Sequence, residues 1–401
     1  MAKFVFVVPP LTGHINPTLS MGAVLLQRGH RVGWITLDQS LASKLPEGGE
    51  LLHINYDESD QQKQDSERYL DIITKKIVYG IDSIKFLYEE VLIPLNRHSY
   101  QGIANLLDQF EPDLVITDHQ MFAGAIAAVN KNLLYATSVT APAAIKVMDE
   151  LPKVHEWEVN QIVALQQEFG IDNASSIACS SLLTMVLTSQ LFFGEMELPT
   201  HYHFTGPVIN RRSVKLTFDW YRLQASNGPK ILVSIGTTFD HEHKKSFFAK
   251  VIEAFGNEEL TVVVVSDPAL FDQWPTNFIV KTQVPQLELL PHLDAVVCHG
   301  GHNTVCETLL NGLPMVVIPI AYDQSHVAGR VVRTGAGLRL NFNRFKASHL
   351  KDAVNEILQN PDYKANAGLL KQSFLDAGGT ETAADLLEQV AIKQPLEVLK
   401  N

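Results

Sequence analysis

Residues 283–324 read QVPQLELLPHLDAVVCHGGHNTVCETLLNGLPMVVIPIAYDQ, and this stretch decides the fold. A short, continuously apolar run at Ala295–Cys298 leads into a Gly-Gly turn and a helix-like segment, and a second apolar run follows at Met315–Ile320. Continuously apolar strands are typical of parallel sheets covered by helices on both faces, and the order strand, helix, strand indicates a right-handed βαβ unit. The stretch therefore predicts an α/β fold.

The same alternation extends in both directions from this stretch. Apolar, β-branched runs are separated by longer helix-like segments, and they lie at Phe4–Val8, Val32–Thr36, Leu51–Asn55, Leu114–Thr117, Leu133–Ser138, Ile231–Ile235, Thr261–Val265 and Phe278–Val280. Repeated βα units predict doubly wound, Rossmann-like sheets, and a length of 401 residues is too great for one ordinary core. We therefore expect two such domains.

The alternation restarts near Pro229, after Gly206-Pro207 and the polar stretch Asn210–Ser213, which reads as a connection between domains. The polar, non-periodic segment Tyr56–Arg68 is predicted to be an exposed loop. We divide the chain into an N-terminal domain (1–206), a linker (207–228), a C-terminal domain (229–379) and a final segment with a helix that Thr380 caps (380–401).

The charge and the composition exclude several classes of protein. The formal net charge of −12 repels phosphate backbones, so we expect no nucleic-acid partner. Only three cysteines are present and no pair has a metal-ligand spacing, which favours a reducing compartment. No signal-peptide core and no run of roughly 20 apolar residues is found. The sequence predicts a cytoplasmic protein.

The turn His299-Gly300-Gly301-His302-Asn303-Thr304 predicts a site for an anion. Glycines let the backbone approach a diphosphate, and the free amides and dipole of a helix N-terminus attract negative charge. His299 and Thr304 add side-chain donors. The alternative is purely structural, because Thr304-x-x-Glu307 also reads as a capping box and Gly-Gly turns are common connectors.

The whole stretch resembles the donor-binding signature of family 1 glycosyltransferases with the GT-B fold. The match comprises Pro285-Gln286, His299, Gly301, Asn303-Thr304, Glu307, Gly312, Pro314 and Asp323-Gln324, in the family's order. The likeness extends over nearly the whole chain and is nearest to the bacterial branch with macrolide and zeaxanthin glucosyltransferases. The resemblance implies two Rossmann-like domains facing a central cleft, with the last helix crossing back to the first domain.

The resemblance also implies a role for each matched residue. His299, Gly301, Asn303 and Thr304 would hold the diphosphate, and a second phosphate contact would come from Ser234, Gly236 and Thr237. Glu307 would accept hydrogen bonds from the ribose hydroxyls, and Asp323 and Gln324 would bind the sugar. Gln283, Val284 and Gln286 would lie beside the nucleoside. Gln283 stands where the family has a base-stacking Trp, so both UDP and TDP sugars remain open.

A candidate general base lies in the first half of the chain. Pro9–Pro17 follows the first strand, its proline and glycine content predicts a loop, and Gly13-His14 and Pro17 match the family's Gly-His-x-x-Pro. An imidazole suits proton abstraction near neutrality. Asp118, at the carboxyl end of a strand, would orient His14, whereas Asp113 precedes that strand and belongs at the opposite edge.

The reaction implied is an inverting transfer of a hexose, most simply glucose, from a UDP-sugar to a hydroxyl. We expect no metal and no cofactor, because the Asp-x-Asp motif that binds a metal-diphosphate in other glycosyltransferases is missing. Three alternatives are weighed: a sugar-nucleotide epimerase, a non-catalytic sugar-nucleotide sensor, and an NAD-dependent dehydrogenase. The last lacks its Gly-x-Gly-x-x-Gly loop.

The acceptor cannot be read from the sequence, and neither can the oligomeric state. A small apolar hydroxylated compound, of terpenoid, carotenoid, flavonoid or macrolide type, is expected from the family alone. Its pocket is expected within residues 70–150, which contain the apolar side chains Phe86, Leu87, Tyr88, Met121, Phe122 and Met148. The alternative is that these side chains simply fill a core.

Overall fold

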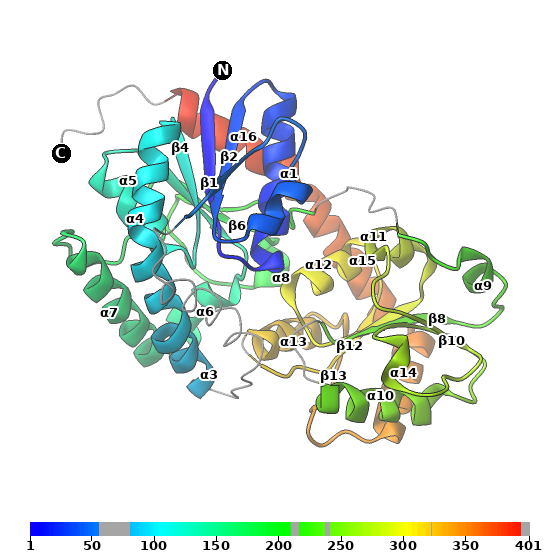
Figure 1. Cartoon of the computed structure of the whole chain (residues 1–401). Helices are drawn as coiled ribbons and strands as arrows, with labels where there is room; N and C mark the ends of the chain where they lie inside the picture. The colour runs from blue at the N-terminus through cyan, green and yellow to red at the C-terminus, as the bar shows by residue number, and fades with distance from the viewer. Residues whose placement is uncertain (56–80, 210–215, 237–240, 322, 394–401) are drawn as a thin grey trace.

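The computed structural model contains two parallel sheets, each flanked by helices, in two lobes (Figure 1). The structure describes residues 1–55, 81–209, 216–236, 241–321 and 323–393. The predicted GT-B architecture of two Rossmann-like domains is confirmed. Within the described ranges, no helix combines the length and the apolar character that crossing a membrane requires.

The N-terminal sheet has seven strands in the order β3-β2-β1-β4-β5-β6-β7, and every neighbouring pair is parallel. The strands are β1 (Lys3–Val7), β2 (Arg31–Thr36), β3 (Glu50–His53), β4 (Leu114–Asp118), β5 (Tyr135–Val139), β6 (Thr184–Val186) and β7 (Tyr202–Phe204). β1 and β4 are almost wholly buried, as expected for central strands covered on both faces.

The C-terminal sheet has six strands in the order β10-β9-β8-β11-β12-β13, again parallel throughout. The strands are β8 (Lys230–Ser234), β9 (Thr261–Val265), β10 (Phe278–Lys281), β11 (Ala295–Cys298), β12 (Met315–Val317) and β13 (Gly337–Arg339). The strand order repeats that of the first sheet, so the two lobes are built on one plan.

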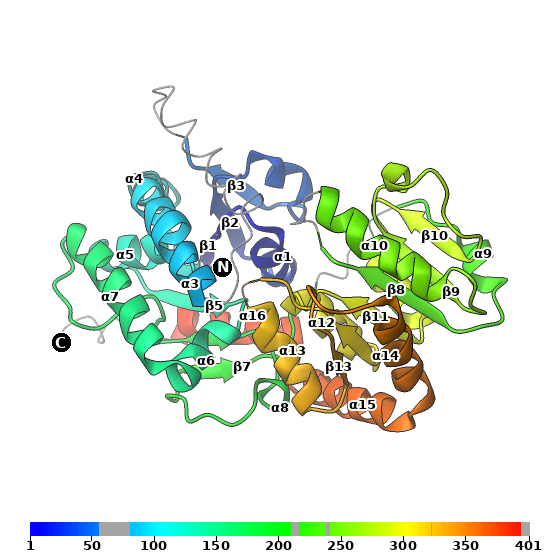
Figure 2. The ribbon, with the colours of Figure 1, turned by 90° about the horizontal axis from the view of Figure 1, so that it is seen from below.

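Helices cover both faces of each sheet (Figures 1 and 2). In the first lobe they are α1 (Thr12–Gln27), α3 (Ile81–Phe86), α4 (Ile93–Phe110), α5 (Phe122–Asn130), α6 (Ala143–Glu150), α7 (Pro152–Glu168) and α8 (Gln190–Phe193), with the short elements η1 (Gln39–Lys44) and η2 (Leu87–Leu92). In the second lobe and beyond they are α9 (Trp220–Gln224), α10 (His241–Phe255), α11 (Gln286–Leu289), α12 (His302–Leu310), α13 (Gln324–Arg333), α14 (Ala347–Gln359), α15 (Pro361–Asp376) and α16 (Gly379–Lys393), with η3 (Pro268–Leu270) and η4 (Leu290–His292).

The chain crosses between the lobes at two places that lie side by side. The amide of Gly379 donates to the carbonyl of Thr205 (2.6 Å), so the outgoing and the returning segments are bonded to each other. Gly206 and Gly379 both have positive φ, at 76° and 64°, and a Cβ on Gly206 would lie 2.8 Å from the carbonyl oxygen of Phe374. Only glycine fits such a close crossing at position 206 without strain.

Helix α16 packs on the first lobe although it follows the second in sequence (Figure 1, red). Its side chains Ala383, Ala384 and Leu387 are fully buried in the core around β1 and α1. Arg28, the residue directly after α1, donates to three carboxylates of α16, those of Glu381, Asp385 and Glu388. This helix is therefore part of the N-terminal core.

All ten predicted strands are present, with ends that differ by up to three residues. Three strands, β6, β7 and β13, were not predicted, and each has only three residues. The predicted loop at Pro9–Pro17 is wrong, since α1 begins at Thr12 and includes Pro17. The cap at Thr380 is also wrong, since α16 begins at Gly379. The loop predicted at Tyr56–Arg68 lies outside the described residues.

Candidate active site

The candidate site residues gather where the strand order of each sheet reverses. In the first sheet this point lies between β1 and β4, and in the second between β8 and β11. Open α/β sheets bind ligands at the carboxyl ends of the strands at such a point, because loops on either side of it diverge and leave a crevice. His14 and Asp118 follow β1 and end β4, whereas Gly236 and His299 follow β8 and β11.

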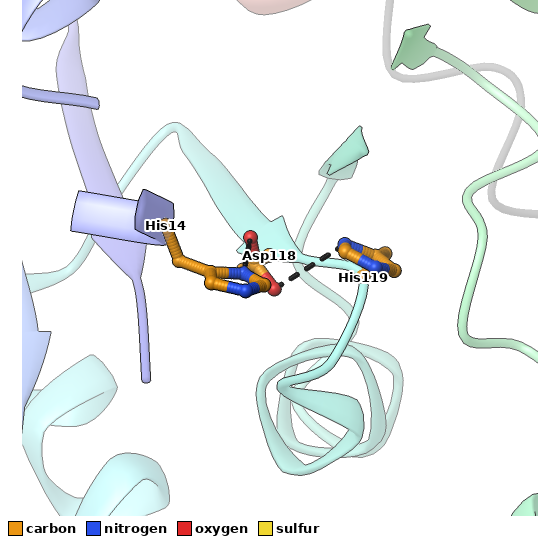
Figure 3. Close-up of side chains that lie close together, drawn as sticks. All are labelled: His14, Asp118 and His119. Carbon is orange, nitrogen blue, oxygen red and sulfur yellow. Dashed lines mark hydrogen bonds and ion pairs between the residues drawn. The ribbon is translucent and has the colours of Figure 1, made fainter. Parts of the chain in front are cut away.

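The first of these groups is a His-Asp pair (Figure 3). His14 Nδ1 lies 3.0 Å from Asp118 Oδ2, and the Asp118 side chain is fully buried. The hydroxyl of Thr140 donates to the same carboxylate oxygen (2.8 Å) and its oxygen lies 2.7 Å from His14 Nδ1. The amide of Gln120 donates to Asp118 Oδ1 (2.9 Å). The carboxylate is thus held on both oxygens and fixes the tautomer and orientation of the imidazole.

The charges of this pair reinforce each other. Burial lowers the pKa of His14, but the charge and hydrogen bond of Asp118, helped by Asp323, outweigh it, and the pKa lies above its usual value. Burial raises the pKa of Asp118, but the interactions with His14 and His119 outweigh this effect. The pKa of Asp118 therefore lies well below its usual range. Asp118 is therefore a permanent anion near neutrality, and it favours protonation of the neighbouring ring.

Pro17 creates a contact between the two domains. Because proline has no amide hydrogen, the carbonyl of Gly13, four residues earlier in α1, receives no bond from the helix backbone. That carbonyl accepts a hydrogen bond from the Asn303 side chain (2.9 Å), which belongs to the first turn of α12. The Pro17 that led to the prediction of a loop thus frees the Gly13 carbonyl, one residue before His14, for a contact with the other lobe.

His299 is enclosed by two glycines of the second lobe. A Cβ on Gly236 would lie 2.9 Å from the His299 ring, and one on Gly301 would lie 2.7 Å from its Nε2, so neither position accepts a side chain. Gly236 also has a φ of 76°. Burial lowers the pKa of His299 to about 4, partly offset by the backbone of Ser234. The imidazole is therefore neutral near pH 7 and carries one N–H donor.

The turn after β11 leads directly into α12, which begins at His302 without a side-chain cap. Asn303 and Thr304 lie within its first turn, where backbone amides lack helical partners and the dipole is positive. The alternative interpretation of Thr304 and Glu307 as a capping box is wrong, because both residues lie inside the helix. Of the second predicted phosphate loop, Ser234 and Gly236 are described, and Thr237 lies outside the described residues.

The predicted ribose contact Glu307 is paired with Gln286. Gln286 Nε2 donates to Glu307 Oε2 (2.5 Å), which joins two residues that the motif placed apart in sequence. Burial raises the pKa of Glu307 to about 7, although the bond from Gln286 opposes the shift. Gln283 is exposed and the neighbouring Val284 is half-buried against the C-terminal core.

Asp323 and Gln324 form the start of α13. Asp323 is partly exposed, burial raises its pKa, and the charges of His14 and His119 oppose that shift, so it faces the His-Asp pair of the other lobe. Gln324 is buried, and its Oε1 accepts from the amides of Ile320 and Ala321 (2.9 and 3.0 Å). Its oxygen is therefore used within the protein, and its amide NH₂ is the part of the side chain that could donate to a ligand.

Several residues of the site were not predicted from the sequence. His119 and Thr140 follow the ends of β4 and β5, and His302 donates across the domains to the carbonyl of Leu187 (3.2 Å). Phe192 of α8 is buried in the C-terminal core, and Arg330 donates to its carbonyl (2.6 Å). The available signal was position, since polar residues at the carboxyl ends of adjacent central strands converge.

The second lobe also meets the first at α13. Figure 2 shows α13 beside α6, and Glu150 of α6 pairs with His326 (3.2 Å) and Arg333 (3.6 Å) of α13. The side chains proposed for an acceptor pocket are mixed: Phe86, Met121 and Phe122 are core residues, whereas Met148 is 36% exposed. Phe86, Met121 and Phe122 therefore fill a core, as the alternative interpretation of the sequence proposed.

Two facing Rossmann-like domains, with a His-Asp pair on one side of the crevice and a glycine-flanked helix N-terminus on the other, define a GT-B glycosyltransferase that uses a nucleotide sugar. Residues 218–377 match the family model described as "UDP-glucoronosyl and UDP-glucosyl transferase", and the protein is an enzyme, a glycosyltransferase.

The similarity to individual proteins extends over both domains. The chain is 27% identical to the NDP-glycosyltransferase YjiC of Bacillus subtilis (strain 168), over 94% of this chain and 95% of the relative. It is 24% identical to the zeaxanthin glucosyltransferase of Pantoea ananas, over 97% and 96%. A crystal structure of the glycotransferase of kitacinnamycin aligns with a TM-score of 0.76 at 22% identity, covering 97% of this chain and 98% of that one.

Proposed function

We propose that the protein transfers a hexose, most simply glucose, from a UDP-sugar to a hydroxyl of a small apolar acceptor, with inversion and without a metal ion. His14 acts as the general base and Asp118 orients it. Residues of the second lobe hold the donor. The observation that carries the proposal is the buried His14–Asp118 pair, 3.0 Å apart, facing α12.

The pair supplies what the attack requires. With Nδ1–H bonded to Asp118, the Nε2 lone pair of His14 is the free basic site, and it removes the acceptor's hydroxyl proton as the oxygen attacks the anomeric carbon. The imidazolium that forms is stabilised by the buried carboxylate. Because the transition state resembles an oxocarbenium ion, departure of the nucleoside diphosphate also needs stabilisation.

The second lobe supplies that stabilisation. The amides of the first turn of α12 and the neutral imidazole of His299 donate hydrogen bonds to the diphosphate, and Thr304, Ser234, Gly236 and Thr237 complete its surroundings. Glu307 accepts from the ribose hydroxyls. Asp323 and the amide of Gln324 bind sugar hydroxyls, and Gln283, Val284 and Gln286 lie beside the base.

The names of the relatives support the class of acceptor. One relative is named for zeaxanthin and another is the demethyllactenocin mycarosyltransferase of Streptomyces fradiae, so apolar hydroxylated acceptors occur among them. YjiC is named only as an NDP-glycosyltransferase, which leaves the base open between UDP and TDP. We place the reaction in the cytoplasm, in keeping with three free cysteines.

The first experiment measures the binding of UDP, UDP-glucose, TDP, GDP and NAD by the thermal shift that each ligand causes. A ligand at a hundred times its dissociation constant stabilises the fold by about 2.7 kcal/mol, which is readily measured. We expect a selective shift with UDP or TDP. A shift with NAD alone, or with none of the five, would refute the donor site.

The second experiment is transfer to a panel of apolar alcohols and phenols in the presence of EDTA. We expect a product whose anomeric configuration, measured by NMR, is opposite to that of the donor. His14→Ala should reduce transfer by about 10²- to 10⁴-fold while the nucleotide affinity is retained. Retention of configuration, activity that requires added Mg²⁺, or an active His14→Ala variant would each contradict the mechanism.

A further inference from the structure

His119 is a buried histidine with no hydrogen-bond partner on either ring nitrogen among the described residues. His119 is 8% exposed, and its backbone amide donates to the carbonyl of Ser138 in β5 (3.1 Å). A buried polar group without a partner costs about 1–3 kcal/mol, so such a group calls for an explanation. Its Nδ1 lies 3.4 Å from Asp118 Oδ1, within ion-pairing distance of the carboxylate but too far for a well-formed hydrogen bond.

His119 completes a set of three potential ligands. His14, Asp118 and His119 each offer one atom, and these three atoms lie within 4.8 Å of one another. Figure 3 shows the carboxylate of Asp118 between the two imidazoles. The ring planes of His14 and His119 differ by only 17°, and their centroids are 5.6 Å apart. Ligand atoms about 2.0–2.2 Å from one ion are roughly 3–3.5 Å apart, so small side-chain rotations would close the set.

The donor set selects the kind of ion. Two imidazoles and one carboxylate suit zinc and neighbouring transition metals, whereas Mg²⁺ and Ca²⁺ prefer oxygen alone. We propose that His14, Asp118 and His119 form an inhibitory site for a divalent transition-metal ion, represented by Zn²⁺. The ion is an inhibitor that competes with catalysis, distinct from any cofactor.

Inhibition follows from which atom the ion occupies, and this step rests on the proposed function of His14. An ion on Nδ1 takes the place of the proton that Asp118 holds, and that proton moves to Nε2. The ring is then neutral with a protonated Nε2, which leaves no lone pair for the acceptor hydroxyl. Occupancy therefore stops proton abstraction without blocking the nucleotide-binding residues of the second lobe.

The decisive measurement is calorimetric titration of Zn²⁺ into the metal-stripped, full-length protein. His119→Phe replaces the imidazole with a planar aromatic ring, one atom larger, that has no nitrogen to bind a metal. His203→Phe on the exposed part of β7 is the matched control. Loss of groups that merely support a ligand costs about 10- to 100-fold in affinity, so loss of a ligand should cost at least tenfold. The control should bind as the wild type does, and Mg²⁺ should give no saturable heat. Equal Zn²⁺ affinity in His119→Phe and wild type would overturn the proposal.

A spectroscopic measurement on the wild type does not depend on how the variant folds. X-ray absorption of the protein with one bound Zn²⁺ should show two imidazole ligands and oxygen, and sulfur or a single imidazole would refute the site. In transfer assays the Zn²⁺ concentration for half inhibition should rise at least tenfold in His119→Phe, and EDTA should restore wild-type activity. Tight binding without inhibition would overturn the inhibitory role of the ion. Failure to bind Zn²⁺ would remove the site and leave the transferase proposal intact.

Discussion

Asp118 determines the charge, the tautomer and the orientation of His14. Asp118→Asn keeps the shape of the side chain but removes the negative charge that lies 3.0 Å from the imidazole. The imidazolium then forms without a counter-charge, so we expect kcat/KM to fall about 10²- to 10⁴-fold. The measurement is steady-state transfer in the presence of EDTA, with the nucleotide affinity of the variant determined alongside.

Asp113 provides the control for this substitution. It belongs to the opposite edge of the same sheet, where its carboxylate accepts from the backbone amide of Lys3 (2.7 Å). Asp113→Asn should therefore leave kcat/KM within about threefold of the wild type, as for ordinary surface substitutions. Comparable losses in both variants would mean that Asp118 acts through stability alone.

The ribose contact proposed for Glu307 predicts that donor binding depends on pH. Burial raises its pKa to about 7, so the carboxyl group gains a proton, and loses an acceptor for the ribose, as the pH falls through that value. The affinity for UDP-glucose should therefore fall by up to about tenfold between pH 8 and pH 6. A sugar nucleotide is the right probe, because a free terminal phosphate would itself titrate near pH 6. Calorimetry should show this dependence for the wild type and a flat profile for Glu307→Gln.

Individual residues were predictable where a motif fixed their spacing. His14, Asp118 and the residues from His299 to Gln324 could be named in advance, because each lies at a strand end or in the matched signature. The pairing of Gln286 with Glu307, and the use of the Gln324 oxygen inside the protein, could not. Those contacts depend on how loops fold back in space, and no spacing in the sequence encodes them.

At the scale of elements, Pro17 links helix geometry to domain contact. Pro17→Ala would restore the missing amide hydrogen, which should bond to the Gly13 carbonyl and compete with Asn303. Since proline inside a helix costs about 3 kcal/mol, we expect the variant to be more stable by up to that amount in urea unfolding. Loss of one hydrogen bond between the lobes should lower kcat/KM roughly 2- to 10-fold.

Asn303→Ala separates this contact from other effects of the proline. If both substitutions act on the bond to Gly13, Pro17→Ala should reduce kcat/KM less in the Asn303→Ala background than in the wild type, and a double-mutant cycle measures this difference. Additive losses would show that Pro17 and Asn303 act independently. The Asn303→Ala variant alone should not gain stability, because the helix backbone is unchanged.

Elements were predictable where the local pattern was strong. The apolar runs such as Ala295–Cys298 gave the central strands, whose burial on both faces leaves a continuous signal. The edge strands β7 and β13 are short and partly exposed, and tertiary pairing alone makes them strands. The start of α1 was misjudged because Pro17 and Gly13 are turn formers in isolation, whereas here the helix tolerates the lost bond.

At the scale of the whole molecule, α16 ties the two ends of the described chain together. Leu387 is fully buried in the core around β1 and α1, so Leu387→Ala should lower the stability of the first lobe by about 2–5 kcal/mol. The fluorescence of Trp34, which is buried in the same core, should report this loss in urea unfolding. The affinity for a UDP-sugar should be unchanged, because the residues proposed to bind it lie in the second lobe.

The exposed Leu369 of α15 serves as the comparison. It is 64% exposed, so Leu369→Ala should change the stability by less than about 0.5 kcal/mol. A matching loss of nucleotide affinity in Leu387→Ala would contradict the assignment of α16 to the first lobe. Whole-molecule features such as this were predictable only through the family resemblance, since nothing local in residues 379–393 indicates which lobe they cover.

The position of α16 also affects how the protein is made. Among the described residues, the first lobe's core contains Val208 and then no further residue until Ala383, a gap of 175 positions in the chain. At ordinary elongation rates of 5–20 residues per second, the ribosome needs about 9–35 s to cover that gap. Throughout that interval the nascent first lobe exposes the apolar surface that Ala383, Ala384 and Leu387 later cover. The first lobe therefore cannot complete its core until the whole second lobe has been synthesised.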